Sequence, residues 1–141
     1  MEKIITNSEQ ETIELGKRIA MQLKKGDIIC MKGDLGAGKT TLTKSIAKNL
    51  GIDEYVTSPT FAIINEYQGE LPLYHFDVYR IEKPEDMYEL GFEDYFYGEG
   101  ICIVEWANLI EGLIPQGCIW IEIDYGSNDG ERVILIDGID I

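Results

Sequence analysis

The stretch "GDLGAGKT", residues 33–40, decides the fold, because it joins a predicted strand to a predicted helix through a glycine-rich loop. The run DIICMKG before it (27–33) is apolar except for its polar ends, as expected of a buried central strand. The run KTTLTKSIAKNL after it (39–50) places its apolar residues on one helical face and stops before Gly51. Strand, loop and helix in this order predict an α/β protein with a phosphate-binding loop.

The loop matches the pattern GxxxxGK[ST] with Gly33, Gly38, Lys39 and Thr40. Glycines allow backbone amides to approach phosphates closely, and the helix that follows adds the positive end of its dipole. Lys39 is predicted to reach the terminal phosphates, and the Thr40 hydroxyl to ligate the Mg²⁺ that bridges them. Gly36 is interpreted as a further phosphate-binding glycine, and Asp34, Leu35 and Ala37 are interpreted as spacers.

Hydrolysis requires a further carboxylate near the metal, usually at the end of a neighbouring strand. The run ICIVEWAN (101–108) is apolar up to Glu105, which makes Glu105 the preferred acid on the metal side; the alternative is an ordinary carboxylate at a strand end. In LPLYHFDVYR (71–80), Asp77 has an open role. His75, the one histidine, is expected to pack or to support a neighbouring side chain rather than to act as a catalyst.

The segment VTSPTFAIINEY (56–67) contains a rigid, hydroxyl-rich turn around Pro59 before a predicted strand. In phosphate-loop proteins such a turn can order on the terminal phosphate. A plain polar turn explains the residues equally well.

Composition limits the function. The formal charge of −14 disfavours direct binding to a nucleic-acid backbone and suits either solubility or a basic protein partner. The three cysteines lie in apolar runs and are expected to be buried, reduced thiols. No signal-peptide core and no apolar run of membrane length is present, so we expect one cytoplasmic domain over residues 1–141, as a monomer.

Five motifs resemble those of the TsaE (YjeE) family in order and spacing: GDLGAGKTTLTK, SPTFAIINEY, YHFDVYR, ELGFEDYF and ICIVEWAN. The resemblance implies a P-loop α/β domain that binds ATP/ADP with Mg²⁺ and hydrolyses ATP slowly. It also implies a role in threonylcarbamoyladenosine modification of tRNA, through docking on a heterodimer of TsaB and TsaD and without gripping the tRNA itself.

The resemblance also implies site residues. Lys39, Asp77 and Glu105 are expected to serve hydrolysis, with Thr40 and Glu105 on the metal. Trp106 matches an aromatic family position, although from the residues alone core packing is the favoured explanation of a buried aromatic. The expected nucleotide-binding residues are Ser8, Gly33, Asp34, Leu35, Gly36, Ala37, Gly38, Lys39, Thr40, Thr41, Thr60 and Arg132.

Three alternatives differ in their sequence requirements. A GTPase requires an NKxD-type element, which the sequence lacks. A small-molecule P-loop kinase, the second candidate, usually brings several arginines to the transferred phosphate, whereas this chain has three, one of them in the first predicted helix. A non-hydrolysing nucleotide sensor would keep the loop and tolerate loss of Glu105.

The predicted fold is a mixed central β-sheet flanked by helices, with the nucleotide at the carboxyl ends of the strands. Predicted helices span 8–25 and 39–50, with shorter ones near 84–96. Predicted strands span 27–33, 62–67, 72–78, 101–105, 118–124 and 132–137, with a hairpin around Gly69.

Overall fold

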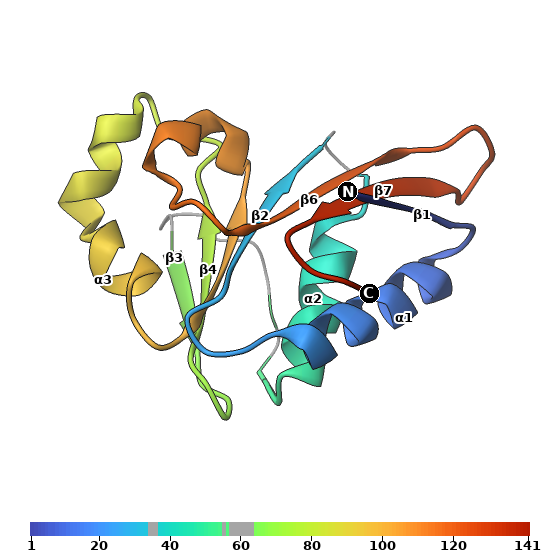
Figure 1. Ribbon diagram of the computed structural model, residues 1–141, viewed down its shortest axis with the longest axis horizontal. Helices are drawn as coiled ribbons and strands as arrows, with labels where there is room; N and C mark the ends of the chain where they lie inside the picture. The colour runs from blue at the N-terminus through green and yellow to red at the C-terminus, as the bar shows by residue number, and fades with distance from the viewer. Residues whose placement is uncertain (34–36, 55, 57–63) are drawn as a thin grey trace.

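A seven-stranded sheet forms the centre of the computed structural model, which describes residues 1–33, 37–54, 56 and 64–141 (Figure 1). The strand order is β1-β7-β6-β2-β5-β4-β3. The strands are β1 (Glu2–Thr6), β2 (Ile28–Lys32), β3 (Ile64–Tyr67), β4 (Leu73–Asp77), β5 (Ile101–Glu105), β6 (Ile119–Tyr125) and β7 (Arg132–Asp137).

The sheet is mixed, as predicted. Strand β2 pairs in parallel with β5 on one side and β6 on the other, and β4 pairs in parallel with β5. The outer pairs β3–β4, β6–β7 and β1–β7 are antiparallel, which confirms the predicted hairpin between β3 and β4. The four parallel strands all end at one edge of the sheet, where ligands bind in open α/β folds.

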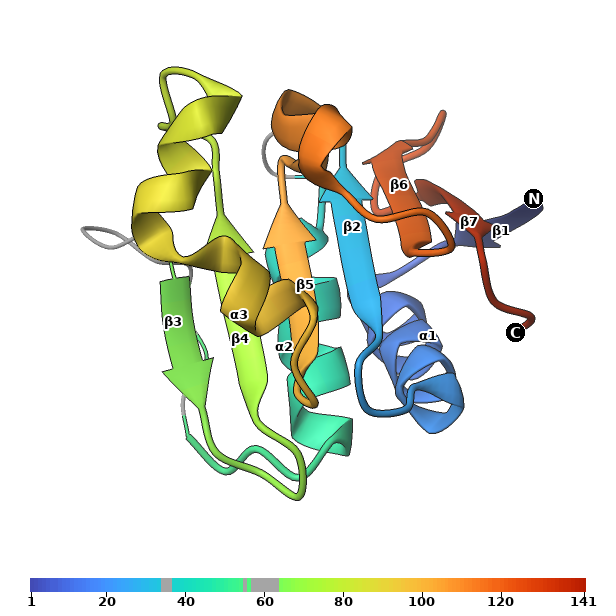
Figure 2. The same ribbon diagram turned by 60° about the vertical axis from the view of Figure 1, so that its left-hand side comes forward.

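Helices cover both faces of this sheet (Figure 2). On one face lie α1 (Glu9–Gln22) and α2 (Lys39–Asn49), and their apolar residues share a core with alternate residues of the strands. On the other face lie the 3₁₀ segments η1 (Pro84–Leu90) and η2 (Ala107–Leu113) and the short helix α3 (Phe92–Phe96). The near-continuous apolar character of β2 and β5 follows from this burial on both faces.

The start of α1 follows from its capping residues. The Ser8 hydroxyl accepts a hydrogen bond from the Glu11 amide, as an N-cap residue does. The Glu11 carboxylate accepts from the amide of Asn7 at 2.9 Å. The return bond of the capping box therefore goes to the residue before the cap, not to Ser8.

The structure differs from the sequence-based prediction in three places. It adds the edge strand β1 and the segment η2, and it ends α1 at Gln22 rather than at residue 25. Strand β1 does not pair with a strand that is close to it in the sequence. It forms because β7, near the other end of the chain, pairs with it in antiparallel orientation. Cys30 and Cys102 are buried as predicted, whereas Cys118 is half-buried.

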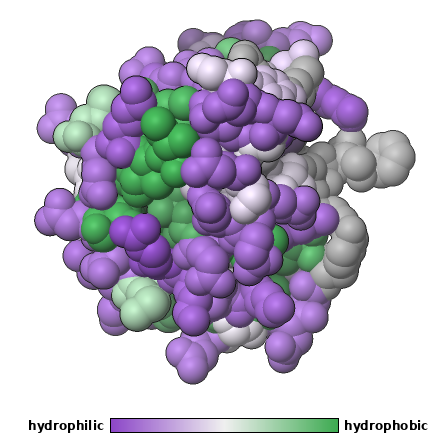
Figure 3. Space-filling model, turned by 90° about the vertical axis from the view of Figure 1, so that its right-hand side faces the viewer, coloured by the Kyte–Doolittle hydropathy of each residue, from purple (hydrophilic) through white to green (hydrophobic). Residues whose placement is uncertain are grey.

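The surface on the side of β1 and β7 is mostly hydrophilic, with hydrophobic areas between the polar side chains (Figure 3). Ile5 of β1 contributes an exposed apolar side chain at 50 %. The exposed Lys3 on the same edge strand is a charge of the kind that discourages pairing with a further strand.

Candidate functional site

The carboxyl ends of three parallel strands bring the predicted site residues together. Gly33 directly follows β2, Asp77 ends β4 and Glu105 ends β5. In the sheet register, Glu105 pairs with Met31 on one side and with Asp77 on the other. The two predicted acids, 28 positions apart in the sequence, are therefore neighbours beside the glycine loop.

Two glycines at the ends of the loop are required by the backbone. Gly33 has φ +140°, and a Cβ there would lie 3.0 Å from the carbonyl carbon of Ile123 on β6 and closer still to its oxygen. Gly38 has φ +109° and is the N-cap residue of α2, in the left-handed region that favours glycine. Gly38 thus permits the sharp turn from the loop into the helix.

Lys39, the first residue of α2, is 5 % exposed. Its Nζ donates a hydrogen bond to the carbonyl oxygen of Gly33 at 2.7 Å and lies 4.5 Å from the centre of the Trp106 ring. The ammonium therefore lies across the loop, between the end of β2 and the end of β5, where a phosphate cradled by the loop would meet it.

Trp106 directly follows Glu105, and its backbone is strained. Its φ of +62° lies in the left-handed region, which residues other than glycine rarely adopt. Its ring packs on the exposed Tyr79 at 4.8 Å between centroids and presents a face to Lys39. Core packing explains only part of this arrangement, because the half-buried indole also contacts the cation of the loop. Backbone strain of this kind clusters at active sites and ligand clamps.

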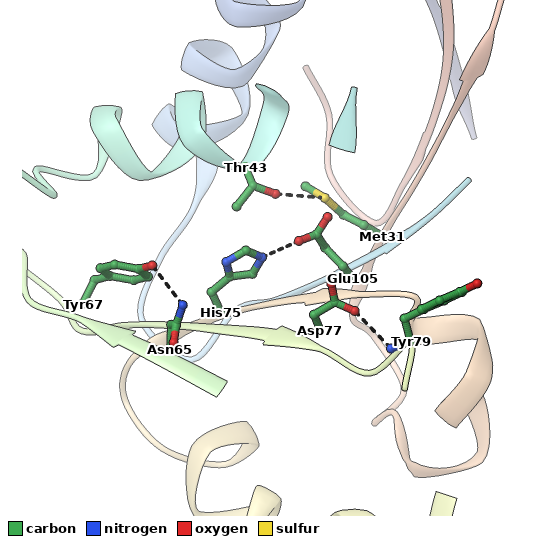
Figure 4. A network of polar contacts seen from close by, with 8 residues as sticks. All are labelled: Met31, Thr43, Asn65, Tyr67, His75, Asp77, Tyr79 and Glu105. Carbon is green, nitrogen blue, oxygen red and sulfur yellow. Dashed lines mark hydrogen bonds and ion pairs between the residues drawn. The ribbon is translucent and has the colours of Figure 1, made fainter. Parts of the chain in front are cut away.

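Glu105 forms a buried pair with His75, and the half-buried Asp77 lies beside this pair at the end of β4 (Figure 4). His75 Nε2 lies 2.5 Å from Glu105 Oε2, and the two side chains are 1 % and 4 % exposed. Asp77 Oδ1 accepts a hydrogen bond from the Tyr79 amide at 3.0 Å. Burial raises the pKa of the Asp77 carboxyl and the Glu105 charge adds to the rise, while the Tyr79 amide, His75 and Lys39 oppose it. Glu105, His75 and Lys39 thus all act on the Asp77 carboxyl at this edge of the sheet.

Arg132 extends the site away from the strand ends. Its Nε donates to the carbonyl oxygen of Ala37 at 3.0 Å, and its guanidinium lies over the ring of Tyr125 at 4.7 Å. It lines a cavity of about 250 Å³ beside the loop and the start of α1, whose wall is formed by Glu9, Thr12, Gly38, Thr41, Gly130 and Arg132. Arg132 and Thr41, both predicted to bind the nucleotide, therefore line one cavity.

Ser8 has a different position. Its hydroxyl caps α1, and among the described residues the cavity wall begins at Glu9 rather than at Ser8. Thr40 is exposed at the start of α2. The predicted residues Asp34, Leu35, Gly36 and Thr60 lie outside the residues that the structure describes.

The donors at this edge fit Mg²⁺ held together with a nucleotide. The described residues include no group of three or more His, Cys, Asp or Glu side chains able to enclose a metal ion by themselves. The threonine hydroxyl and the carboxylate are hard oxygen donors, and Mg²⁺ commonly takes one or two carboxylates and completes its shell with phosphates and water. Thr40 and Glu105 would supply such oxygens.

A central parallel strand that runs into a GxxxxGKT loop and a helix N-terminus, with acids at the ends of the next strands, defines the P-loop NTPase-like α/β class. The family model described as "Threonylcarbamoyl adenosine biosynthesis protein TsaE" matches residues 6–134. The chain belongs to the TsaE family, whose role is in the biosynthesis of threonylcarbamoyladenosine in tRNA.

Individual relatives agree with this assignment. The tRNA threonylcarbamoyladenosine biosynthesis protein TsaE of Bacillus subtilis is 48 % identical over 135 residues, covering 95 % of this chain and 84 % of the relative. The protein of the same name from Treponema pallidum is 36 % identical and covers 95 % of this chain and 98 % of the relative. The crystal structure of YdiB from Bacillus subtilis superposes with a TM-score of 0.78 at 46 % identity, over 94 % of this chain and 82 % of that one.

No helix in the described part of the chain has the length and apolar character needed to cross a bilayer.

Proposed function

We propose that the chain is a Mg²⁺-dependent ATPase that serves threonylcarbamoyladenosine formation by docking on the TsaB–TsaD heterodimer. The observation that carries the ATPase proposal is the convergence of Lys39, Asp77 and Glu105 on the glycine loop. The family model supports the pathway.

The cationic side of the site binds the phosphates. Lys39 exchanges the Gly33 carbonyl for phosphate oxygens, and the free amides at the start of α2 add partial positive charge. The ring of Trp106 limits where the ammonium can move, so the lysine stays over the loop. The cavity beside Arg132 takes the nucleoside end of ATP or ADP.

The acidic side of the site serves the metal and the attacking water. Bound Mg²⁺ would neutralise charge on the β and γ phosphates. Glu105 and Thr40 would hold this metal. Asp77, whose pKa is raised mainly by burial, accepts a hydrogen bond from water at the strand end and orients it.

Docking on a protein rather than on tRNA agrees with the charge of the chain. With 26 acidic and 12 basic residues, the surface repels a phosphate backbone and attracts a basic protein face. In this proposal, bound nucleotide controls whether the chain associates with TsaB–TsaD.

Phosphate release from ATP by purified protein tests the proposal. Glu105→Ala is expected to lower hydrolysis about 100-fold or more, because its oxygens would hold the metal that stabilises the transition state, while Lys39 and the loop amides retain much of the ATP binding. The exposed Glu111 on η2 gives the control variant Glu111→Ala, which is expected to hydrolyse ATP normally. Normal hydrolysis by Glu105→Ala would reject the assignment, and phosphate transferred to a metabolite would favour the kinase alternative.

A second experiment tests the partner. TsaB and TsaD are mixed with this chain with and without ATP, and the complex is detected by size-exclusion chromatography. Assembly that depends on nucleotide supports the proposal. Failure to assemble under either condition refutes the docking part and leaves the ATPase part to the hydrolysis assay.

A further inference from the structure

His75 has a single described polar partner, and that partner is the acid of the site. Its Nε2 lies 2.5 Å from Glu105 Oε2, whereas its Nδ1 is buried and has no hydrogen-bond partner in the described part of the chain. An unpaired buried polar atom costs free energy. An apolar residue would fill the same space without that cost, so packing alone does not explain a histidine here.

The sheet register places the two side chains together. His75 pairs with Ile103, and Glu105 follows two residues later on the same face of β5. Both side chains therefore point to the face covered by α2, where Thr43 and Met31 lie across from them (Figure 4). Diagonal neighbours on adjacent strands are within reach of long side chains.

The direction of the hydrogen bond follows from the acid. An ionised carboxylate only accepts, so toward such a carboxylate it is His75 Nε2 that donates, while Nδ1 is the atom without a partner among the described residues. The bond occupies Oε2 of Glu105. The second oxygen, Oε1, is then the one that a ligand at the loop can use.

We propose that His75 is a positioning residue: its Nε2–H holds the Glu105 carboxylate in one orientation, so that Oε1 faces the Mg²⁺ of a bound nucleotide. This inference rests on the proposed function. Partners that orient metal-binding carboxylates in this way typically change metal affinity 10- to 100-fold when removed. The bond also satisfies a carboxylate that is almost fully buried before any metal arrives.

Two substitutions separate positioning from packing. His75→Met fills the space without a donor, whereas His75→Gln places an amide N–H near the position of Nε2. ADP affinity is measured by calorimetry across a Mg²⁺ titration and in EDTA. We expect His75→Met to raise the Mg²⁺ concentration that gives half of the Mg²⁺-dependent gain in ADP affinity about tenfold or more. Its ADP affinity in EDTA should stay within about twofold of wild type. His75→Gln is expected to recover most of the loss.

Leu73→Val is the matched control. Leu73 lies two residues earlier on β4, on the same sheet face, and is fully buried. This variant is expected to melt at lower temperature with an unchanged Mg²⁺ profile. An unchanged profile in His75→Met, or an equal shift in Leu73→Val, overturns the role of His75. Wild-type protein without Mg²⁺-dependent ADP binding refutes the proposed function, and this inference with it.

Nuclear magnetic resonance of the single histidine provides a readout that does not depend on the His75 variants folding. The chain has one histidine, so ¹⁵N-histidine labelling reports His75 alone. We expect the Nε2-protonated tautomer, with the ring nitrogen shifts changed in Glu105→Gln. An Nδ1-protonated ring, or shifts unaffected by Glu105→Gln, overturns the proposal.

Discussion

Helices α1 and α2 pack so closely at Gly16 that a methyl group does not fit between them. A Cβ added to Gly16 would lie 2.5 Å from the Cβ of Ser45, against 3.4–4 Å for ordinary contact. Rotation of Ser45 does not relieve this overlap, because its Cβ is fixed to the backbone and its Oγ donates to the carbonyl oxygen of Ile13 at 2.5 Å. Gly16→Ala must therefore move the helices apart by about 1 Å, the shortfall from ordinary contact.

The expected cost combines two opposing terms. Overpacking of this kind costs about 1–3 kcal/mol, while alanine gains about 1 kcal/mol over glycine in a helix. Because the overlap involves a Cβ rather than a flexible chain end, we expect Gly16→Ala to lower the free energy of unfolding by about 1–2 kcal/mol. For a chain of this length that lowers Tm by about 3–6 °C.

The assay is thermal and urea unfolding followed by circular dichroism. Gly112→Ala is the control, since a Cβ at this exposed position meets no described atom within 4 Å, and its stability should be unchanged or slightly higher. Gly16→Ala combined with Ser45→Gly should recover the packing part of the loss. A Gly16→Ala protein as stable as wild type would refute the reasoning. Nucleotide affinity should also fall, because residues of both α1 and α2 line the cavity beside the loop.

Three further predictions concern the loop lysine, the cavity and the thiols. Lys39→Ala should weaken ATP binding about 10- to 100-fold by calorimetry, since a charge-assisted bond of about 1.5–3 kcal/mol is lost, while Lys48→Ala at the exposed end of α2 should bind normally. Arg132→Ala should weaken binding of ATP but not of tripolyphosphate, because Arg132 lines the cavity that receives the nucleoside; an equal loss for both ligands would contradict this placement. Burial raises the pKa of Cys102 to about 12 and that of Cys30 higher. In the unfolded chain a thiol has a pKa of about 8.5, below both folded-state values. The two buried thiols therefore contribute their full share of the free energy of unfolding below about pH 8.5. Above that pH the unfolded chain loses the thiol protons first, and each thiol lowers the free energy of unfolding by up to about 1.4 kcal/mol per pH unit. Urea unfolding at about pH 8 and 10.5 should therefore show a smaller loss in the Cys30→Ala/Cys102→Ala variant than in wild type; equal losses would show that other groups cause the change.

Local patterns predicted most of the elements well, because they depend on periodicity and capping over a few residues. The central strand, the helix after the loop and the β3–β4 hairpin lie where the sequence places them. Strand β1 was missed because its pairing partner β7 lies at the other end of the chain. The end of α1 was placed three residues too late, because charge-rich last turns carry no strong stop signal before Gly26.

The site, too, has parts that follow from local sequence and parts that depend on contacts between distant segments. The sequence alone determined the loop, Lys39 and the acid that ends β5, because each is specified by residue type and spacing along one segment. Only the tertiary structure decided that His75 holds Glu105, that Trp106 lies over Lys39 and that Arg132 bonds to Ala37, 95 positions away in the sequence. These contacts depend on strand register and on side-chain direction, which are set when the sheet assembles and leave no periodic signal in the chain.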